Sequence, residues 1–285
     1  MRRRFQHVTI IGVGLLGGSI GLALKRRFRA HVAGVGRRQA SLDEALRRGT
    51  IDEAFLDAAA PASRSDLVIL ATPVRAFEAH LRAIAPVLKP SCLVTDVGST
   101  KAVVVASAQR VFRRGRCPFV GSHPMAGSEQ RGSAFAREDL LEGTLCLITP
   151  TARTADADVA AVEALWSDLG MRVMRMTPAA HDRAVAAISH LPHALSALLM
   201  LLPAEGDLKL SAGGFRDMTR LSAGDVEMWR DIFLTNPKAV AAALDRFGRS
   251  LAKLREAIAR GDAAKIEKLL TQARRRRQDF ANRDV

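Results

Sequence analysis

A short apolar segment followed at once by a glycine-rich turn limits the possible folds of this chain more than any other feature. Val8–Ile11 (VTII) has the composition of a buried strand, residues 12–17 read GVGLLG, and the helix-forming segment Ser19–Arg27 follows. In such a turn the first glycine permits a tight bend, the second lets the backbone approach a pyrophosphate, and the third allows close packing of helix on strand. The order strand, turn and helix predicts a dinucleotide site, and a turn without a ligand is the alternative. The residues expected around the pyrophosphate are Gly12, Gly14, Leu15, Leu16 and Gly17.

The first part of the chain alternates short apolar runs with helical stretches. This pattern is typical of an α/β fold, in which helices cover both faces of a parallel sheet. Because the runs are nearly all apolar rather than alternating, each strand is expected to be buried on both sides. We therefore predict a Rossmann-type, doubly wound dinucleotide-binding domain over residues 1–177. Its expected strands are Val8–Ile11, Val32–Val35, Leu67–Ala71, Leu93–Asp96, Phe119–Gly121, Leu145–Thr149 and Arg172–Met176.

The character of the sequence changes after Thr177-Pro178. Residues 178–285 contain long stretches of helical periodicity and no convincing strand, which predicts a second, all-α domain. The segment Ile188–Leu202 is apolar on almost every side, so it should be buried centrally or against another subunit. We therefore expect a symmetric homodimer whose interface is built by this helical domain.

Two arginines, Arg37 and Arg38, follow the second predicted strand, at the position that distinguishes NAD from NADP. At the end of the second strand, about twenty residues past the turn, a carboxylate would bind the ribose 2′-hydroxyl of NAD, whereas arginine accommodates the 2′-phosphate of NADP. Residues 34–38 read GVGRR, so NADP is preferred and NAD is possible. If Arg37 and Arg38 are only solvated loop charges, NAD would still bind. Thr72 and Pro73 are also assigned to the cofactor site.

The formal net charge of +14 admits nucleic acid, a membrane surface or an acidic small molecule as partner. The basic residues are scattered along the chain, tyrosine is absent, and few aromatic residues lie among them for base stacking. We therefore expect a small acidic molecule as partner, and neither nucleic acid nor a membrane.

The cellular compartment is inferred from the cysteines and the N-terminal run. Cys92, Cys117 and Cys146 are an odd number without CxxC spacing, so neither a disulfide framework nor a zinc site is expected. The apolar run up to Leu24 has the outline of a secretory signal or an anchor, but no small-residue cleavage site is evident, and the dinucleotide turn explains its glycines. A cytoplasmic protein is expected.

Five segments occur in order between Val8 and the 230s. They are Gly12–Ser19, Asp96–Lys101, Gly121–Glu129, Ser189–His193 and Phe215–Arg220. Together they resemble the prephenate/arogenate dehydrogenase family, also called cyclohexadienyl dehydrogenases, and HPMAGSE and SHLPH are the most specific parts. The resemblance implies an enzyme of tyrosine biosynthesis that oxidatively decarboxylates prephenate or arogenate and transfers hydride to NAD(P). The implied products are 4-hydroxyphenylpyruvate or tyrosine, with CO2.

The substrate implied by the resemblance is a cyclohexadiene with a ring carboxylate at one end and a hydroxyl group at the other. Hydride leaves the carbinol carbon, and loss of CO2 makes the ring aromatic, so no metal is required. His123 is the implied acceptor at the hydroxyl, at the carboxyl end of a predicted strand, and imidazole has a suitable pKa. Ser99 is the implied second group there. The alternative for His123 is a structural histidine before Pro124. The alternative for Ser99 is that, with Thr100, it only caps a helix that starts at Lys101.

Arg220 is implied to bind a substrate carboxylate, because a guanidinium holds a carboxylate bidentately. Asp217, three residues earlier, is expected to orient Arg220. A surface arginine, or one that only forms an ion pair with Asp217, is the alternative.

Further substrate contacts follow from the resemblance. His193 is expected to face the substrate, and His190 is either buried or forms a metal site with His193, since residues three apart share a helical face. Glu129 is expected in a mobile or gating contact near the ring, and Trp229 is expected to approach a site from the partner subunit. Ser122 is also assigned to the substrate site.

Two other functions are considered. One is a different reductase with a Rossmann domain and a helical domain, of the β-hydroxyacid dehydrogenase or imine reductase type, and the paired segments HPMAGSE and SHLPH argue against it. The other is a basic, dinucleotide-sensing binding protein, which the joint presence of His123, Ser99 and Arg220 disfavours. The preference for prephenate or arogenate, the strictness of the preference for NADP, and inhibition by tyrosine stay open.

Overall fold

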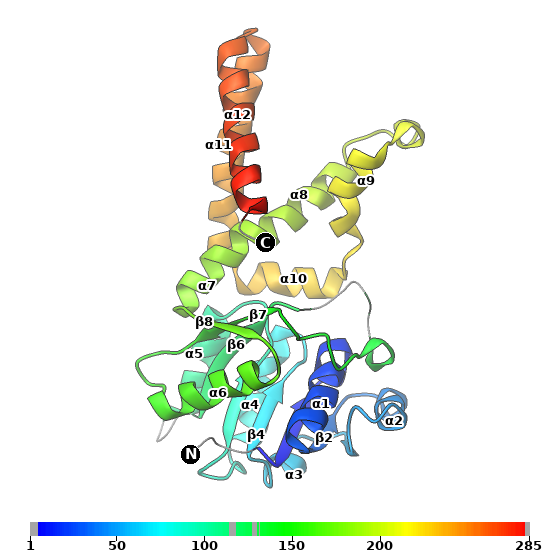
Figure 1. Cartoon of the computed structure of the whole chain (residues 1–285), viewed down its shortest axis with the longest axis vertical. Helices are drawn as coiled ribbons and strands as arrows, with labels where there is room; N and C mark the ends of the chain where they lie inside the picture. Colours follow the sequence, from blue (N-terminus) through cyan, green and yellow to red (C-terminus); the bar gives the residue numbers. More distant parts are fainter. Residues whose placement is uncertain (1–4, 114–117, 127–129, 131, 283–285) are drawn as a thin grey trace. The chain divides into compact units, whose positions relative to one another are not determined.

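The computed structural model describes residues 5–113, 118–126, 130 and 132–282. In this part of the chain, eight strands form one sheet in the order β3-β2-β1-β4-β5-β6-β7-β8 (Figure 1). Neighbours from β3 to β6 are parallel, β6 and β7 are antiparallel, and β7 and β8 are parallel. The strands are β1 (His7–Ile11), β2 (His31–Val35), β3 (Glu53–Phe55), β4 (Leu67–Leu70), β5 (Leu93–Asp96), β6 (Phe119–Pro124), β7 (Leu145–Thr149) and β8 (Arg172–Arg175).

The predicted Rossmann-type fold is confirmed, with three differences in the sheet. All seven expected strands are present, but β3 was not expected, because its residues Glu53-Ala54-Phe55 form no apolar run. The antiparallel pairing of β6 with β7 interrupts the expected parallel sheet. Strand β6 also continues three residues beyond Gly121, so His123 lies inside the strand rather than after it.

Each face of the sheet has its own apolar core. On one face, α1 (Leu15–Phe28), α2 (Gln39–Arg47) and α6 (Asp156–Asp168) contribute to a cluster that includes Trp166. On the other face, α3 (Ala59–Ala62), α4 (Phe77–Ile84) and α5 (Ala102–Val111) contribute to a second cluster that includes Phe77. Alternate residues of β4 enter different clusters: Ile69 joins the first and Leu70 the second. The apolar strand sequences are therefore explained by helices on both faces.

Helices follow β8. Thr177 begins α7, because its side chain accepts a hydrogen bond from the Ala180 N–H at 3.2 Å and proline follows it in the first turn. A π-helical turn, Ala186–His190, separates α7 from α8 and precedes Pro192, which has no N–H to donate to that turn. The helices of this part are α7 (Pro178–Val185), α8 (Leu191–Met200), α9 (Gly213–Thr219), α10 (Val226–Thr235), α11 (Pro237–Ala259) and α12 (Ala263–Ala281). Among the described residues, no helix has both the length and the apolar character needed to cross a membrane.

The chain divides into two compact units, Met1–Pro237 and Lys238–Val285. The second unit consists mainly of the long helices α11 and α12. The expected division into residues 1–177 and 178–285 rests on a change of secondary structure and stays a prediction. The strongly apolar segment Ile188–Leu202 carries several exposed side chains in the single chain, among them Leu201 and Leu202 at 80% and 77% exposure.

Candidate active site

The three glycines of the dinucleotide turn have different steric roles. Gly12 has φ = +104°, and a Cβ atom there would lie 2.6 Å from the Ala71 carbonyl. A Cβ atom on Gly17 would lie 2.1 Å from the carbonyl oxygen of Gly12, so the turn and α1 can approach only without a side chain. Gly14, the N-cap of α1, has open space where its Cβ would be. The helix N-terminus and this open space suit the pyrophosphate of a dinucleotide.

The residues after the turn hold a neighbouring segment on α1. The Ser19 hydroxyl oxygen accepts a hydrogen bond from the backbone N–H of Arg137 at 2.9 Å. A Cβ atom on Gly18 would lie 2.9 Å from the Cβ of Ala136. Gly18 is therefore required for this packing, a contact that the fingerprint pattern does not indicate.

The residues assigned to the cofactor lie around the turn. Arg37 and Arg38 are exposed after β2, and Arg38 is the N-cap of α2. No ion pair joins either arginine to an acidic residue within the described part of the chain. Thr72 and Pro73 follow β4, and the closeness of Gly12 to the Ala71 and Thr72 backbones places this loop beside the turn. The geometry suits a dinucleotide, and a preference for NADP stays a prediction.

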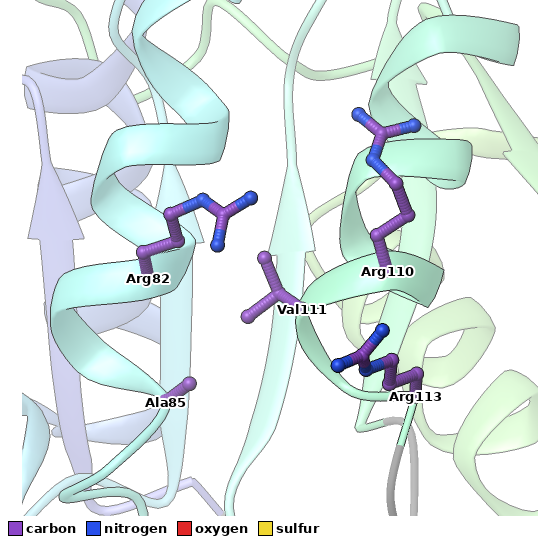
Figure 2. Close-up of a pocket in the computed structure, with 5 residues that line it drawn as sticks. All are labelled: Arg82, Ala85, Arg110, Val111 and Arg113. Atoms are coloured by element: carbon purple, nitrogen blue, oxygen red, sulfur yellow. The ribbon is translucent and has the colours of Figure 1, made fainter.

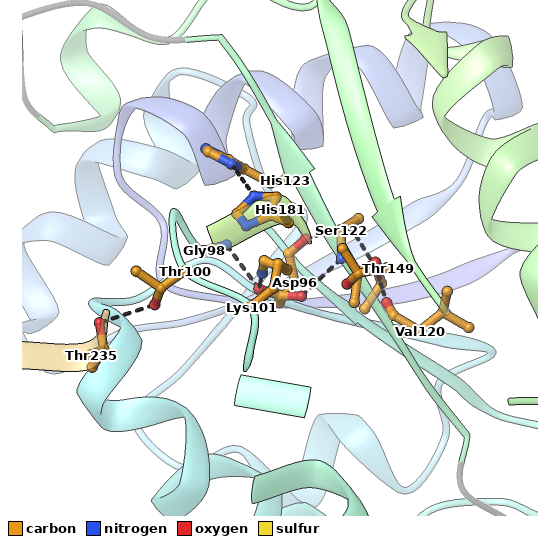
Figure 3. A network of polar contacts seen from close by, with 12 residues as sticks. Asp96, Gly98, Thr100, Lys101, Val120, Ser122, His123, Thr149, His181 and Thr235 are labelled. Carbon is orange, nitrogen blue, oxygen red and sulfur yellow. Dashed lines mark hydrogen bonds and ion pairs between the residues drawn. The ribbon is translucent and has the colours of Figure 1, made fainter. Parts of the chain in front are cut away.

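His123 is half-buried in β6 and contacts a second histidine (Figure 3). Its Nδ1 lies 2.9 Å from Nε2 of His181 in α7, and the ring centroids are 5.1 Å apart. Burial is the largest cause that holds the pKa of His123 well below the usual value for histidine, and repulsion by His181, when that imidazole is protonated, and by Lys101 adds to it. A neutral imidazole is therefore expected near pH 7, and it can accept a proton or a hydrogen bond.

A fully buried ion pair lies beside His123. Lys101 Nζ contacts Asp96 Oδ2, and both side chains have 0% exposure (Figure 3). Asp96 Oδ1 also accepts a hydrogen bond from the Ser122 N–H at 3.0 Å, and Oδ2 accepts one from the Gly98 N–H at 2.9 Å. Burial raises the pKa of Asp96, although Lys101 opposes this effect. The pair joins the end of β5 to β6, the strand of His123.

Ser122 does not have the position expected of a substrate contact. Its hydroxyl group is fully buried, lies 2.7 Å from the Thr95 hydroxyl, and donates to the backbone carbonyl of Asp96. Successive residues of a strand point to opposite faces, so Ser122 points inward where His123 points outward. We correct the sequence-based assignment: Ser122 connects β5 and β6.

The N-terminus of α5 is not capped by Ser99 or Thr100, which was the alternative considered from the sequence. The helix begins at Ala102. Asp182 of α7 accepts the Lys101 N–H at 2.8 Å and the Ala102 N–H at 2.9 Å instead. The Thr100 hydroxyl lies 3.0 Å from that of Thr235. Ser99 is half-buried, and the assigned role of its hydroxyl at the substrate stays a prediction.

His193 stacks on Trp229 of the same chain. The ring centroids are 3.6 Å apart and the planes differ by 10°. A Cβ atom on Gly224 would lie 2.7 Å from both rings. Trp229 therefore has a place beside His193 without a second subunit, and its expected approach from a partner stays a prediction.

His190 points to a different neighbour. Its Nδ1 lies 3.4 Å from Nδ2 of Asn236, which donates to the Asp182 carbonyl at 2.8 Å. Burial lowers the pKa of His190 to about 4, so it is a buried neutral histidine. Within the described ranges, no group of three or more His, Cys, Asp or Glu side chains is arranged to hold a metal.

The residues assigned to the substrate carboxylate lie near α8. Arg220 is exposed at the start of the 3-10 helix Arg220–Ala223, which packs against α8, the helix of His193. Asp217 is exposed on α9, three residues earlier. Glu129 lies outside the described residues. The structure thus places Arg220 and His193 on neighbouring elements.

A surface cavity of about 490 Å³ lies elsewhere, at the C-terminal ends of α4 and α5 (Figure 2). Arg82 and Arg110 line it, and each donates to Glu78 at 2.7 Å. In a parallel α/β sheet, ligands bind at the carboxyl ends of the strands, whereas these helix ends lie at the opposite edge. The cavity is therefore separate from the candidate site. Its lining residues are Arg82, Ala85, Arg110, Val111 and Arg113.

Sequence reasoning assigned no role to His181, Asp182, Asp96 or Lys101. Asp96 and Lys101 lie within one of the matching segments, and an acidic residue that ends an apolar strand could have indicated a buried polar network. His181 and Asp182 follow a proline at a helix start, and nothing in the local pattern indicates contact with His123.

Two family models together match most of the chain, from residue 20 to residue 272. "Prephenate dehydrogenase, nucleotide-binding domain" matches residues 20–175, and "Prephenate dehydrogenase, dimerization domain" matches residues 177–272. The predicted order of a nucleotide-binding domain and a helical dimerization domain is thereby confirmed. A different reductase, the alternative considered above, is not favoured.

Three similar proteins agree with these models. The prephenate dehydrogenase of Bacillus subtilis is 33% identical over 93% of this chain and 74% of its own length. The cyclohexadienyl dehydrogenase of Zymomonas mobilis is 33% identical over 90% of each chain. The structure of A. aeolicus prephenate dehydrogenase, in complex with hydroxyphenyl propionate and NAD+, has a TM-score of 0.91, is 33% identical, and covers 98% of this chain and 100% of that chain. The chain therefore belongs to the prephenate dehydrogenase family.

Proposed function

We propose that this protein catalyses the oxidative decarboxylation of prephenate or arogenate with hydride transfer to NAD(P). The observation that carries the proposal is the pairing of a dinucleotide turn with His123, a neutral imidazole at the carboxyl edge of the same sheet. Membership of the prephenate dehydrogenase family supports the substrate class.

His123 accepts the proton of the substrate hydroxyl group as hydride leaves the adjoining carbon. Ser99 hydrogen-bonds the same hydroxyl group. A bound nicotinamide would supply the hydride acceptor. The ring carboxylate then leaves as CO2, the electron pair of the broken bond makes the ring aromatic, and the ring oxygen takes the proton back from the His123 imidazolium. Formation of the aromatic ring drives the reaction.

Binding of the substrate is assigned to residues of the helical part. Arg220 holds a carboxylate of the substrate by paired charge-assisted hydrogen bonds, and Asp217 orients it. His193, stacked on Trp229, faces the ring or its side chain.

NADP is the preferred cofactor in this proposal, because Arg37 and Arg38 offer two guanidinium groups to a 2′-phosphate. Replacing both arginines by serine is expected to weaken NADP binding by roughly 1–3 kcal/mol and to leave NAD binding nearly unchanged. Cofactor titration by fluorescence measures both affinities. An equal loss for NAD and NADP would contradict the assignment.

We also propose a cytoplasmic homodimer whose interface includes the exposed leucines of α8 and its C-terminal end. Leu198, Leu201 and Leu202 are 55%, 80% and 77% exposed in the single chain, a cluster that a second subunit would cover. The proposed domains are residues 1–177 and 178–285. Sedimentation equilibrium at micromolar concentration tests the assembly, and a monomeric mass would contradict it.

A steady-state assay with each substrate crossed against each cofactor tests the reaction. Turnover of prephenate or arogenate, with release of CO2 and reduction of NADP or NAD, is expected. Turnover of β-hydroxyacids alone would favour a different reductase and overturn the proposal.

A further inference from the structure

A chain of hydrogen bonds runs from His123 in β6 to two residues of α7. His123 Nδ1 lies 2.9 Å from His181 Nε2, and His181 Nδ1 lies 2.8 Å from Asp182 Oδ1. The His181 side chain has 0% exposure, and Asp182 is also buried. The three side chains come from β6 and α7, so the tertiary fold brings the first of them to the other two.

The far end of the chain is a carboxylate that is held in its charged form. Asp182 accepts backbone hydrogen bonds from Lys101 and Ala102 at 2.8 and 2.9 Å, where the N-terminus of α5 also favours negative charge. Burial alone would raise the pKa of Asp182, but the hydrogen bonds from His181 and from these two N–H groups outweigh it and lower the pKa. Asp182 is therefore only an acceptor in this network.

The direction of each hydrogen bond follows from that end. Because ionised Asp182 can only accept, His181 must donate through Nδ1–H. Burial lowers the pKa of His181, and a neutral imidazole that has its proton on Nδ1 has a lone pair on Nε2. That lone pair must accept, so His123 donates through its own Nδ1–H. Nε2 of His123 is then left with the lone pair.

We propose that His181 and Asp182 are positioning residues that fix His123 in the Nδ1–H tautomer, so that its Nε2 is the acceptor for the proton of the substrate hydroxyl group. This inference rests on the proposed function. When the hydroxyl proton moves to Nε2, His123 becomes an imidazolium. Its Nδ1–H still donates to His181, and the negative charge of Asp182 stabilises the new positive charge through the intervening ring.

Other charged groups face this chain. Lys101 and Asp96 form a buried pair with no net charge beside the two histidines. His190 of the π-helical turn is buried and neutral near pH 7. The charge on Asp182 favours the cation formed on His123, against the effects of Lys101 and His190, which lower the pKa of His123.

The tautomer can be measured in the ligand-free protein by long-range 1H–15N correlation spectra with 15N-labelled histidine. We expect His123 to be protonated on Nδ1. The signals of His123 are identified as those that are missing from the spectrum of His123→Asn. His181→Leu removes the acceptor, so the His123 signals should shift toward a mixture of tautomers. His181→Gln places an amide oxygen near the former Nε2 and should restore much of the Nδ1–H tautomer. His190→Gln is the matched control, since His190 is also buried but contacts Asn236, and it should leave the His123 signals in place.

The kinetic test separates positioning from general structure. His181→Leu is expected to lower kcat roughly 10–100-fold, the loss typical when the partner that orients an imidazole is removed, with KM changed less than about threefold. At pH values where His181 is neutral, loss of the acceptor on Nδ1 makes the His123 imidazolium less stable, so the acid limb of kcat/KM should move to lower pH. A merely structural role would lower kcat without moving that limb.

Two results would overturn the inference. One is a His123 that carries its proton on Nε2 in the parent protein. The other is a His181→Leu variant, folded by circular dichroism, in which both the tautomer and the acid limb match the parent. If His181→Leu does not fold, the spectra of His181→Gln decide the question. The inference then requires a population of the His123 Nδ1–H tautomer that is lower than in the parent protein. The spectra need no substrate, so they test the tautomer independently of the proposed function. If the parent protein turned over neither prephenate nor arogenate, the proposed function would be wrong, and the tautomer would still be decided by the spectra.

Discussion

The glycine turn and the histidine centre are both parts of the candidate site, but they are built in different ways. The turn occupies six consecutive residues, 12–17, and its requirements are steric: Gly17 must approach the carbonyl of Gly12. The histidine centre takes His123 from β6, His181 from α7 and Lys101 from the start of α5. Its requirements are electrostatic and are met only after the sheet and helices have assembled. A local motif can therefore be recognised from sequence alone, whereas the partners of His123 cannot.

The largest effect is expected at His123. His123→Asn removes the acceptor that acts as hydride leaves, so turnover should fall by about 10²–10⁴ with little change in KM. Steady-state kinetics with saturating cofactor measures both constants. His31→Asn is the control, because His31 lies at the start of β2 and pairs with Glu53. Near-normal turnover of His123→Asn at saturating substrate would make this histidine structural.

The sequence predicted seven strands and the carboxyl-edge location of His123 because apolar runs and their ends are local properties. It did not predict β3, whose first residue, Glu53, breaks the apolar pattern. It misassigned Ser122, which lies in the part of β6 that pairs with β7. That pairing extends β6 to Pro124, and the local sequence does not reveal it. His181 was missed because a helix sequence does not reveal which strand the helix will cover.

A smaller effect, on binding, is expected at Arg220. Its guanidinium holds a carboxylate that is already charged in the ground state, so Arg220→Gln should act mainly on KM, with an apparent loss of about 2–5 kcal/mol if the anion is desolvated. The control is Arg216→Gln, which removes an exposed arginine one helical turn earlier on α9. Unchanged KM for both prephenate and arogenate in Arg220→Gln would place the anion site elsewhere.

The glycine turn offers a matched pair of substitutions. Gly17→Ala forces a Cβ against the Gly12 carbonyl and should lower the free energy of unfolding by about 3 kcal/mol, and cofactor affinity with it. Gly14→Ala places a Cβ in open space, so it should change stability by less than about 1 kcal/mol. It should still weaken the dinucleotide, whose pyrophosphate needs that space. Urea unfolding and cofactor titration measure the two effects, and equal destabilisation by both variants would refute the steric distinction.

The smallest expected effect is on the pH dependence of the free energy of unfolding. It distinguishes the two regions, because the histidine centre contains titratable groups and the glycine turn does not. Burial lowers the pKa of His190 to about 4 in the folded protein, whereas in the unfolded chain its pKa is near the usual value of about 6.5. Below that value the unfolded chain binds more protons, so the free energy of unfolding must fall as the pH falls. Between pH 7 and pH 5, His190 alone should account for a loss of about 2 kcal/mol.

His123 and His181 have pKa values shifted in the same direction and add to this loss. His190→Gln removes one of these contributions, so its free energy of unfolding should depend less on pH than that of the parent, by about 2 kcal/mol between pH 7 and pH 5. Urea unfolding of both proteins at pH 7, 6 and 5 measures the difference. Parallel curves for the parent and His190→Gln would mean that His190 is protonated in the folded protein, and that the centre around Asp182 is not the neutral histidine cluster described above.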